Sequence, residues 1–244
     1  MSYEINILHL YPDLLNLYGD KGNIMSLQKR LMWREISANV AVCNQGDTPD
    51  IQNADIILLG GGPERETEIV VSLLKDHKEE LSDFIENGKT LLALCTGFEI
   101  LGKTYPNSGK SVEGLGLLDI TTEPADTRFI GNVIIENTDL GKLSGFENQG
   151  GKTNIGSYAP LGKIITGYGN DGSGQFEGLV YKNLTASNLH GPLLPKNPAL
   201  CDMILTNTLK YKYPDFSELS PLDDTLEISA NNYIIETFGT QLPK

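Results

Sequence analysis

Short apolar runs alternate with longer segments of helical spacing through the first 102 residues, and this alternation restricts the fold more than any other feature. The run at 90–94 is apolar on both sides, as expected for a strand in the middle of a parallel sheet. The runs occupy residues 5–10, 38–43, 54–59 and 90–94, and the helical segments occupy 23–36 and 64–87, the second ending at Gly88. This order predicts an α/β fold, with helices on both faces of a layered sheet.

The second half of the chain has a different texture. Glycine-rich turns separate β-like runs at 117–122, 132–136 and 178–181, so strands joined by tight turns are expected and the sheet becomes partly mixed. Residues 198–211 and 222–238 have helical spacing and are expected to close the chain as two helices. No repeat or linker interrupts the sequence, so we predict a single domain over residues 1–244.

Composition excludes several classes of partner. The chain has 19 Lys and Arg against 32 Asp and Glu, a net charge of −13, and no basic run. A field of this sign repels phosphate, so neither nucleic-acid binding nor direct membrane insertion is expected. The sequence shows no secretory signal and no apolar run of about 18 residues, and its three cysteines fit neither a disulfide framework nor a metal motif. We therefore expect a cytoplasmic protein without a metal site.

The most informative local feature is the point where an apolar strand runs into a helix. Residues 91–94 are all apolar, Cys95 follows, and Gly97 comes two positions later as helical spacing begins. This is the layout of a nucleophile elbow, in which a small residue at Gly97 lets neighbouring backbone pass close by. The helix N-terminus is expected to lower the pKa of the Cys95 thiol below about 8.5. The alternative is a buried cysteine that packs as a small hydrophobe.

A cysteine nucleophile needs a base, and the chain has three histidines. His9 lies inside an apolar strand, where a structural histidine with satisfied hydrogen bonds is expected. His77 lies in a charged run and is expected on a solvated helix face. His190 begins an irregular loop just past a strand, where sites form in open α/β sheets, and is the candidate base.

A covalent mechanism on an amide also needs hydrogen-bond donors for the oxyanion. Residues 60–62 are three glycines after an apolar strand, and their backbone N–H groups can point into a site. A phosphate-binding loop is a competing interpretation, but Pro63 lacks an N–H, and Glu64 and Glu66 would repel phosphate. A plain turn before a helix is the other alternative.

The glycine turn, the cysteine at an elbow and the late histidine together resemble class I glutamine amidotransferases, in particular the cobyric acid synthase-like branch. Three longer motifs are similar to the family of glutaminase subunits of lipid II isoglutaminyl synthase: YPDLLNLYGDKGN at 11–23, GFENQGG at 145–151 and NLHGPLLPKNP at 188–198. The resemblance implies the flavodoxin-like fold of class I glutamine amidotransferases.

The resemblance also implies roles for individual residues. Cys95 would be the nucleophile and His190 the base, and the oxyanion hole would come from the backbone of Gly61 and Thr96. Arg128, in the segment DTRFIGN at 126–132, would bind the substrate. A guanidinium suits that role because it can bind the α-carboxylate of glutamine through two hydrogen bonds. The alternative for Arg128 is a surface salt bridge.

Two positions depart from the family pattern. Pro192 stands where triad-type members carry a glutamate that orients the histidine, so we expect either a Cys-His dyad or an acid supplied by a partner. Gln149 stands where related sequences often have histidine. An amide cannot shuttle protons, so we assign Gln149 no catalytic role.

The function that the resemblance implies is hydrolysis of L-glutamine through a cysteine thioester. Ammonia would pass to a Mur ligase-like partner subunit that amidates the D-glutamate of lipid II in peptidoglycan synthesis. We expect no cofactor in this chain, and ATP and Mg²⁺ on the partner. Two rival interpretations are a cysteine peptidase or esterase on a similar fold, and a non-catalytic binding subunit.

Overall fold

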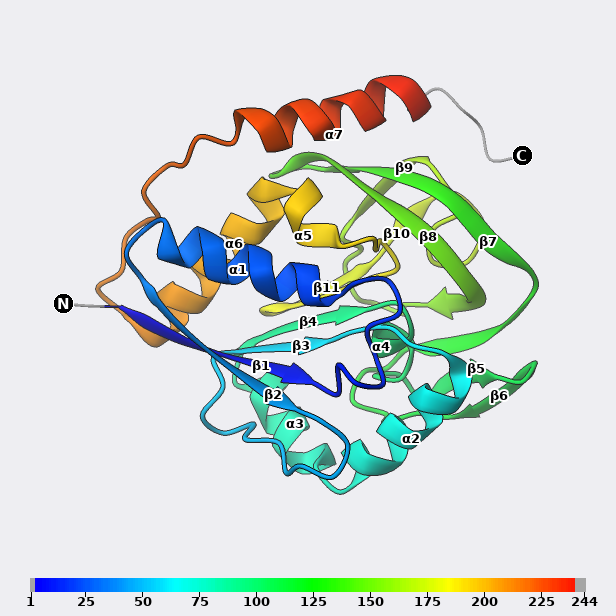
Figure 1. Ribbon diagram of the computed structural model, residues 1–244. Coiled ribbons are helices and arrows are strands. Elements are labelled where there is room, and N and C mark those ends of the chain that lie inside the picture. Colours follow the sequence, from blue (N-terminus) through cyan, green and yellow to red (C-terminus); the bar gives the residue numbers. More distant parts are fainter. Residues whose placement is uncertain (1–2, 240–244) are drawn as a thin grey trace.

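The computed structural model describes residues 3–239, and its first sheet has six strands in the order β11-β12-β4-β3-β1-β2 (Figure 1). Neighbouring strands are parallel from β12 to β2, and β11 runs antiparallel to β12. The strands are β1 (Glu4–Leu10), β2 (Ser37–Cys43), β3 (Ile56–Leu59), β4 (Thr90–Leu94), β11 (Leu179–Tyr181) and β12 (Leu184–Ser187). The predicted α/β fold with parallel central strands is confirmed.

Helices cover both faces of this sheet, as the sequence predicts (Figure 1). On one face α1 (Lys21–Met32) and α6 (Pro198–Lys212) pack in the same core as Ile56 and Leu58 of β3. On the other face α2 (Glu64–Lys75) and α3 (Lys78–Glu86) pack with Ile57 and Leu59. Successive strand residues point to opposite faces, so an all-apolar strand fills two cores.

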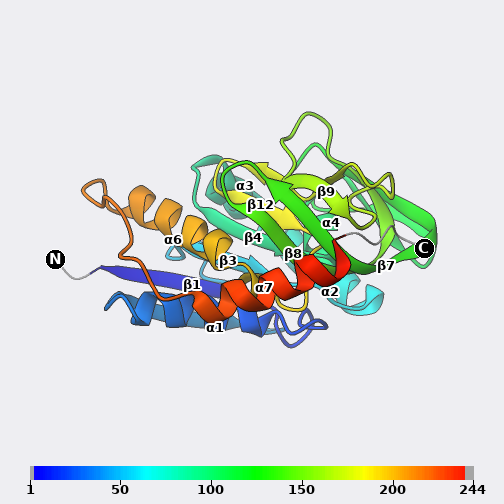
Figure 2. The same ribbon diagram turned by 90° about the horizontal axis from the view of Figure 1, so that it is seen from above.

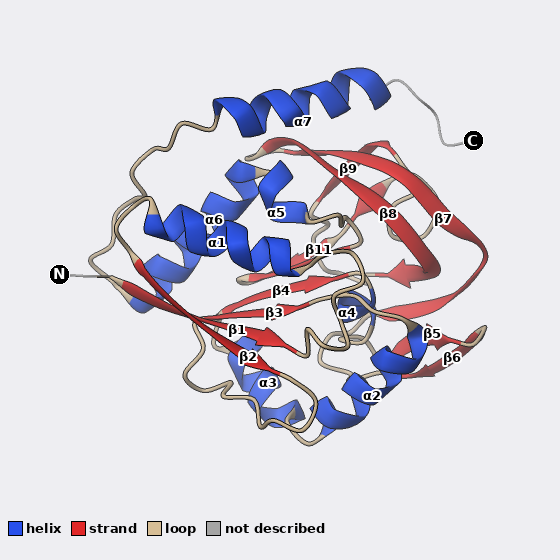
Figure 3. Ribbon diagram, in the orientation of Figure 1, coloured by secondary structure: helices blue, strands red, loops and turns tan. Residues whose placement is uncertain are grey.

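A second sheet of six strands lies beside the first, with the order β10-β9-β7-β5-β6 and with β8 paired to β7 (Figure 3). Its members are β5 (Thr104–Asn107), β6 (Lys110–Glu113), β7 (Thr121–Asn137), β8 (Gly141–Asn154), β9 (Gly162–Thr166) and β10 (Phe176–Glu177). The partly mixed half of the fold is therefore a separate sheet, antiparallel except between β5 and β7. Ile135 and Leu143 of the β7-β8 hairpin share a core with Leu92 of β4, which joins the two sheets.

The helix predicted over residues 64–87 is wrong, because the chain breaks there into α2 and α3. A continuous helix of that length would extend about 36 Å, far beyond the short strands that it covers. The break keeps Leu74 of α2 and Leu81 of α3 in one core.

His77 is the N-cap residue of α3, and its side chain is only 21% exposed. Its Nδ1 atom lies 3.6 Å from the Glu80 carboxylate, so the predicted solvated position is also wrong. Gly88, at φ +78°, ends α3 as predicted.

The last helix, α7 (Thr225–Phe238), lies along the outside of the molecule beside β8 (Figure 2). The start of α7 is held to the rest of the molecule by Arg30 of α1. This side chain donates hydrogen bonds of 2.6 Å to Asp202 in α6 and to Asp224, the N-cap residue of α7. Within residues 3–239, no helix is both long and apolar enough to span a membrane.

Candidate active site

The predicted catalytic residues lie at one edge of the first sheet, where its parallel strands end. Residues 60–62 follow β3, Cys95 follows β4, and His190 lies three residues beyond the end of β12. The backbone N–H of Cys95 donates a 2.9 Å hydrogen bond to the carbonyl of Ser187, so the β4 and β12 ends remain paired up to the site.

Cys95 occupies the strand-to-helix turn that the sequence predicts. Its backbone has φ +53° and ψ −122°, a conformation that costs about 1–3 kcal/mol for a residue with a side chain. A Cβ on Gly97 would lie 2.5 Å from the carbonyl oxygens of Leu59 and Gly60, so this position requires glycine. The backbone of Gly61 packs against the Cys95 side chain, since a Cβ on Gly61 would lie 2.8 Å from the Cβ of Cys95.

The thiol of Cys95 has a raised pKa, so the prediction of a lowered pKa is wrong. The residue is only 4% exposed, and burial is the largest cause, followed by the nearby Glu99 carboxyl. The backbone N–H of Thr96 and the Arg128 guanidinium act in the opposite direction but do not prevail. Helix α4 (Thr96–Glu99) is a single turn, too short for its dipole to offset the loss of solvation.

His190 is buried against an aromatic ring that the sequence analysis missed. The imidazole is stacked on Tyr18, with ring centroids 3.7 Å apart and an interplanar angle of 12°. Burial and the charge of Lys196 lower the pKa of His190 to about 4, so the ring is neutral at pH 7. Its Nε2 atom is buried and has no hydrogen-bond partner in the described part of the chain. Tyr18 lies in the motif at 11–23, which is the only signal that pointed to it.

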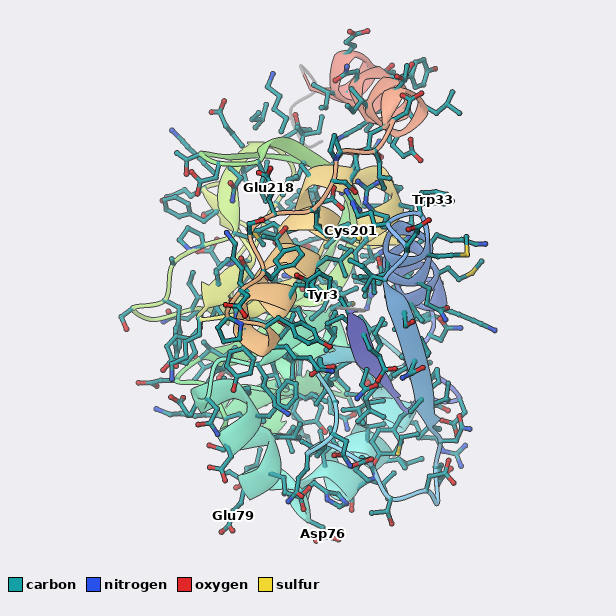
Figure 4. All side chains as sticks on the ribbon, turned by 90° about the vertical axis from the view of Figure 1, so that its left-hand side faces the viewer. Tyr3, Trp33, Asp76, Glu79, Cys201 and Glu218 are labelled. Atoms are coloured by element: carbon teal, nitrogen blue, oxygen red, sulfur yellow. The ribbon has the colours of Figure 1, made fainter. Side chains whose placement is uncertain are left out.

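The remaining histidine and cysteines lie elsewhere. Burial lowers the pKa of His9 to about 4, and its Nε2 atom lacks a partner among residues 3–239, contrary to the expectation of a satisfied histidine. Cys43 is a buried free cysteine at the end of β2. Cys201 lies in the interior between the ribbons, whereas Trp33 stands at the outer edge (Figure 4).

Gly61 has its backbone N–H bound to another group. It donates a 3.0 Å hydrogen bond to the carboxylate of Asp20, a buried residue just before α1. Burial raises the pKa of Asp20 to about 6. The next N–H, of Gly62, donates to Thr96 Oγ1 at 3.0 Å. An oxyanion at Cys95 would therefore compete with Asp20 for the Gly61 N–H, and the oxyanion hole at Gly61 and Thr96 stays a prediction.

Arg128 lies on β7 where the pairing with β8 shifts register, between Pro124 and Phe129. Its Nε donates to Asn148 Oδ1 at 3.0 Å, and its Nη2 donates to the Asn148 carbonyl at 2.9 Å. The guanidinium is near enough to lower the pKa of Cys95 and of Glu99, although burial outweighs it at both groups. Asn148 thus holds Arg128, which makes no salt bridge among residues 3–239, and its role as substrate ligand stays a prediction.

The two departures from the family pattern are structural residues in this fold. Pro192 packs closely on Gly22: a Cβ on Gly22 would lie 2.5 Å from the proline ring. Gln149 is buried, and its amide donates to the Gly169 carbonyl at 2.8 Å and to Glu147 at 3.3 Å. In the described residues, no group of three or more His, Cys, Asp or Glu side chains is placed to hold a metal ion.

Comparisons with known proteins show the family of the chain. The model of the CobB/CobQ-like glutamine amidotransferase domain matches residues 6–198. The lipid II isoglutaminyl synthase (glutamine-hydrolyzing) subunit GatD of Staphylococcus aureus is 38% identical over 98% of this chain and 98% of its own length. The protein of the same name from Streptococcus pneumoniae is 38% identical over 92% of this chain and 88% of its own length. A solved glutamine amidotransferase shares the fold, with a TM-score of 0.55, 18% identity, and coverage of 82% of this chain and 98% of that one.

Proposed function

Because the chain belongs to the family of CobB/CobQ-like glutamine amidotransferase domains, we propose that it is the glutaminase subunit of a lipid II isoglutaminyl synthase. The observation that carries the proposal is the placement of Cys95 on a strained elbow whose strand is paired with the strand that leads to His190. The similarity to two such subunits over nearly the full chain supports the choice of lipid II synthase within the family.

The reaction follows from the residues at the sheet edge. The imidazole of His190 takes the proton of the Cys95 thiol, and the sulfur attacks the side-chain amide carbon of glutamine. When the tetrahedral intermediate collapses, the C–N bond breaks, His190 gives its proton to the leaving nitrogen, and ammonia departs. Water, deprotonated by His190, then attacks the thioester and releases glutamate. Arg128 would hold the α-carboxylate, and backbone N–H groups of Gly61 and Thr96 would bind the oxyanion.

Without a partner, neither the nucleophile nor the base is in the charged form that this chemistry uses. Burial raises the pKa of the Cys95 thiol and lowers that of His190 to about 4, so both groups are neutral at pH 7. A partner that supplies a carboxylate to the imidazole, or that orders the loop from His190 to Pro195, would stabilise the imidazolium and raise its pKa. The partner would be a Mur ligase-like subunit that receives the ammonia and holds ATP and Mg²⁺.

The test is to assemble the chain with its ligase subunit and to supply lipid II with either glutamine or an ammonium salt. Cys95→Ala should abolish the glutamine-dependent amidation and leave the ammonium-dependent amidation intact, because the acceptor chemistry lies on the other subunit. Amidation from glutamine by the Cys95→Ala complex would refute the proposal. So would the absence of amidation by the wild-type complex with both nitrogen sources.

A further inference from the structure

Glu177 is a fully buried carboxylate with an unusual set of partners. It lies in β10 at 0% exposure, and in the described residues its hydrogen bonds come from neutral donors. One oxygen accepts from the Ser187 hydroxyl at 2.9 Å and from the Asn188 backbone N–H at 2.6 Å. The other accepts from the Asn188 side-chain amide at 3.4 Å.

The bonds from Ser187 and Asn188 connect Glu177 to the last residue of β12 and to the residue after it, two positions before the base, and the backbone N–H of Gly178 also favours the ionised carboxylate. The Ser187 hydroxyl that donates to Glu177 also accepts the N–H of Leu189 at 3.0 Å. The carbonyl of Ser187 accepts the N–H of Cys95 at 2.9 Å. Glu177 therefore touches a tripeptide that is bonded to the nucleophile on one side and continues into His190 on the other.

The position of Glu177 is itself fixed. The next residue, Gly178, has φ +71°, and a Cβ there would lie 2.7 Å from the Ala186 carbonyl. The side chain of Asn170 binds both backbone groups of Gly178, accepting its N–H at 2.8 Å and donating to its carbonyl at 2.9 Å. The backbone that carries the Glu177 carboxylate is therefore held in place next to Ser187 and Asn188.

A carboxylate can accept from all of these donors at once. An ionised carboxylate accepts on both oxygens, whereas glutamine would turn an NH₂ group toward one set of donors. Burying the charge opposes ionisation and raises the pKa of Glu177, which the surrounding N–H and O–H donors partly offset. The cost of burying Glu177 is thus offset only by bonds to its own loop and to the segment that leads to His190.

We propose that Glu177 is a positioning residue that sets the His190 imidazole against the Cys95 sulfur by holding the backbone of residues 187–189. This inference rests on the proposed glutaminase function and adds a residue to it. Glu147, another buried carboxylate, does not share the role, since it accepts the N–H groups of Tyr168 and Gly169 instead. Misplacement of a catalytic group by about 1 Å can reduce the rate about 100-fold.

Glutamine hydrolysis by the chain assembled with its ligase subunit provides the test. The variants are Glu177→Gln, Ser187→Ala and the control Thr208→Val. The control removes a buried 2.7 Å hydrogen bond to Thr90, at the opposite end of β4 from Cys95. Active sites are counted by covalent labelling of Cys95, and all assays run well below the melting temperature of each variant.

The positioning role predicts that Glu177→Gln lowers kcat per labelled site at least tenfold, with KM within about twofold of wild type. Ser187→Ala should also lower kcat per labelled site. The double variant should be no slower than the slower single variant, because both substitutions break the same connection between Glu177 and Ser187. Thr208→Val should lower the melting temperature with kcat unchanged.

Unchanged kcat per site in Glu177→Gln, with only a lower melting temperature, would overturn the positioning role and leave the glutaminase function standing. If Glu177→Gln does not fold, Ser187→Ala decides, since it keeps the carboxylate: unchanged kcat there overturns the proposal. A wild-type complex that does not hydrolyse glutamine would overturn both proposals.

Discussion

Glu99 is a buried acid whose replacement should change how stability depends on pH. It lies one turn beyond Cys95 and is 3% exposed, and burial raises its pKa to about 8 from an ordinary value of 4.5. The folded chain therefore holds a proton that the unfolded chain releases, so the contribution of Glu99 to stability declines as the pH rises from about 4.5 to about 8. The slope is about 1.4 kcal/mol per pH unit, or about 3 kcal/mol between pH 5 and pH 7.5.

Urea unfolding of wild type and Glu99→Gln at about pH 5 and about pH 7.5 measures this slope. Other titrating groups are shared by the two proteins and cancel in the comparison. We expect the free energy of unfolding of Glu99→Gln to gain up to about 3 kcal/mol on wild type across this range. Parallel pH dependences would show that Glu99 ionises normally and would refute this account of its burial.

Two further predictions concern the substrate and the partner. Arg128→Ala should reduce kcat/KM for glutamine by about 2 kcal/mol or more, with little change in the alkylation of Cys95 by iodoacetamide; an equal loss in both reactions would make Arg128 structural. Binding of the ligase subunit should raise glutamine turnover at least tenfold, about 1.4 kcal/mol in the barrier, because Pro192 stands where a glutamate that orients His190 would be expected. Equal turnover with and without that subunit would show that the dyad is complete by itself.

The sequence predicted β1, β3 and β4 of the first sheet well because these central strands are short and mostly apolar. The runs at 5–10, 54–59 and 90–94 correspond to β1, β3 and β4, and the elbow at Cys95 lies where the pattern placed it. Periodicity failed between residues 64 and 87, because α2 and α3 share one helical spacing across a break that only the dimensions of the sheet impose.

The chemistry of the site was harder to predict, because an acidic residue is expected at the surface when only the sequence is known. Asp20, Glu99 and Glu177 are all buried, and each contacts or influences a catalytic element. The sign of the Cys95 pKa shift was missed for the same reason, since burial depth depends on the complete fold. The Asp20 bond to Gly61 joins residues 41 positions apart, which local patterns do not reveal.

The central claim is that Cys95 is the nucleophile for glutamine, and intact-mass measurement after treatment with a glutamine-mimicking diazoketone tests it most directly. We expect one adduct per chain, located at Cys95, slowed by added L-glutamine and absent from Cys95→Ser. An adduct on Cys43 or Cys201, or an adduct on Cys95 whose formation glutamine does not slow, would contradict it.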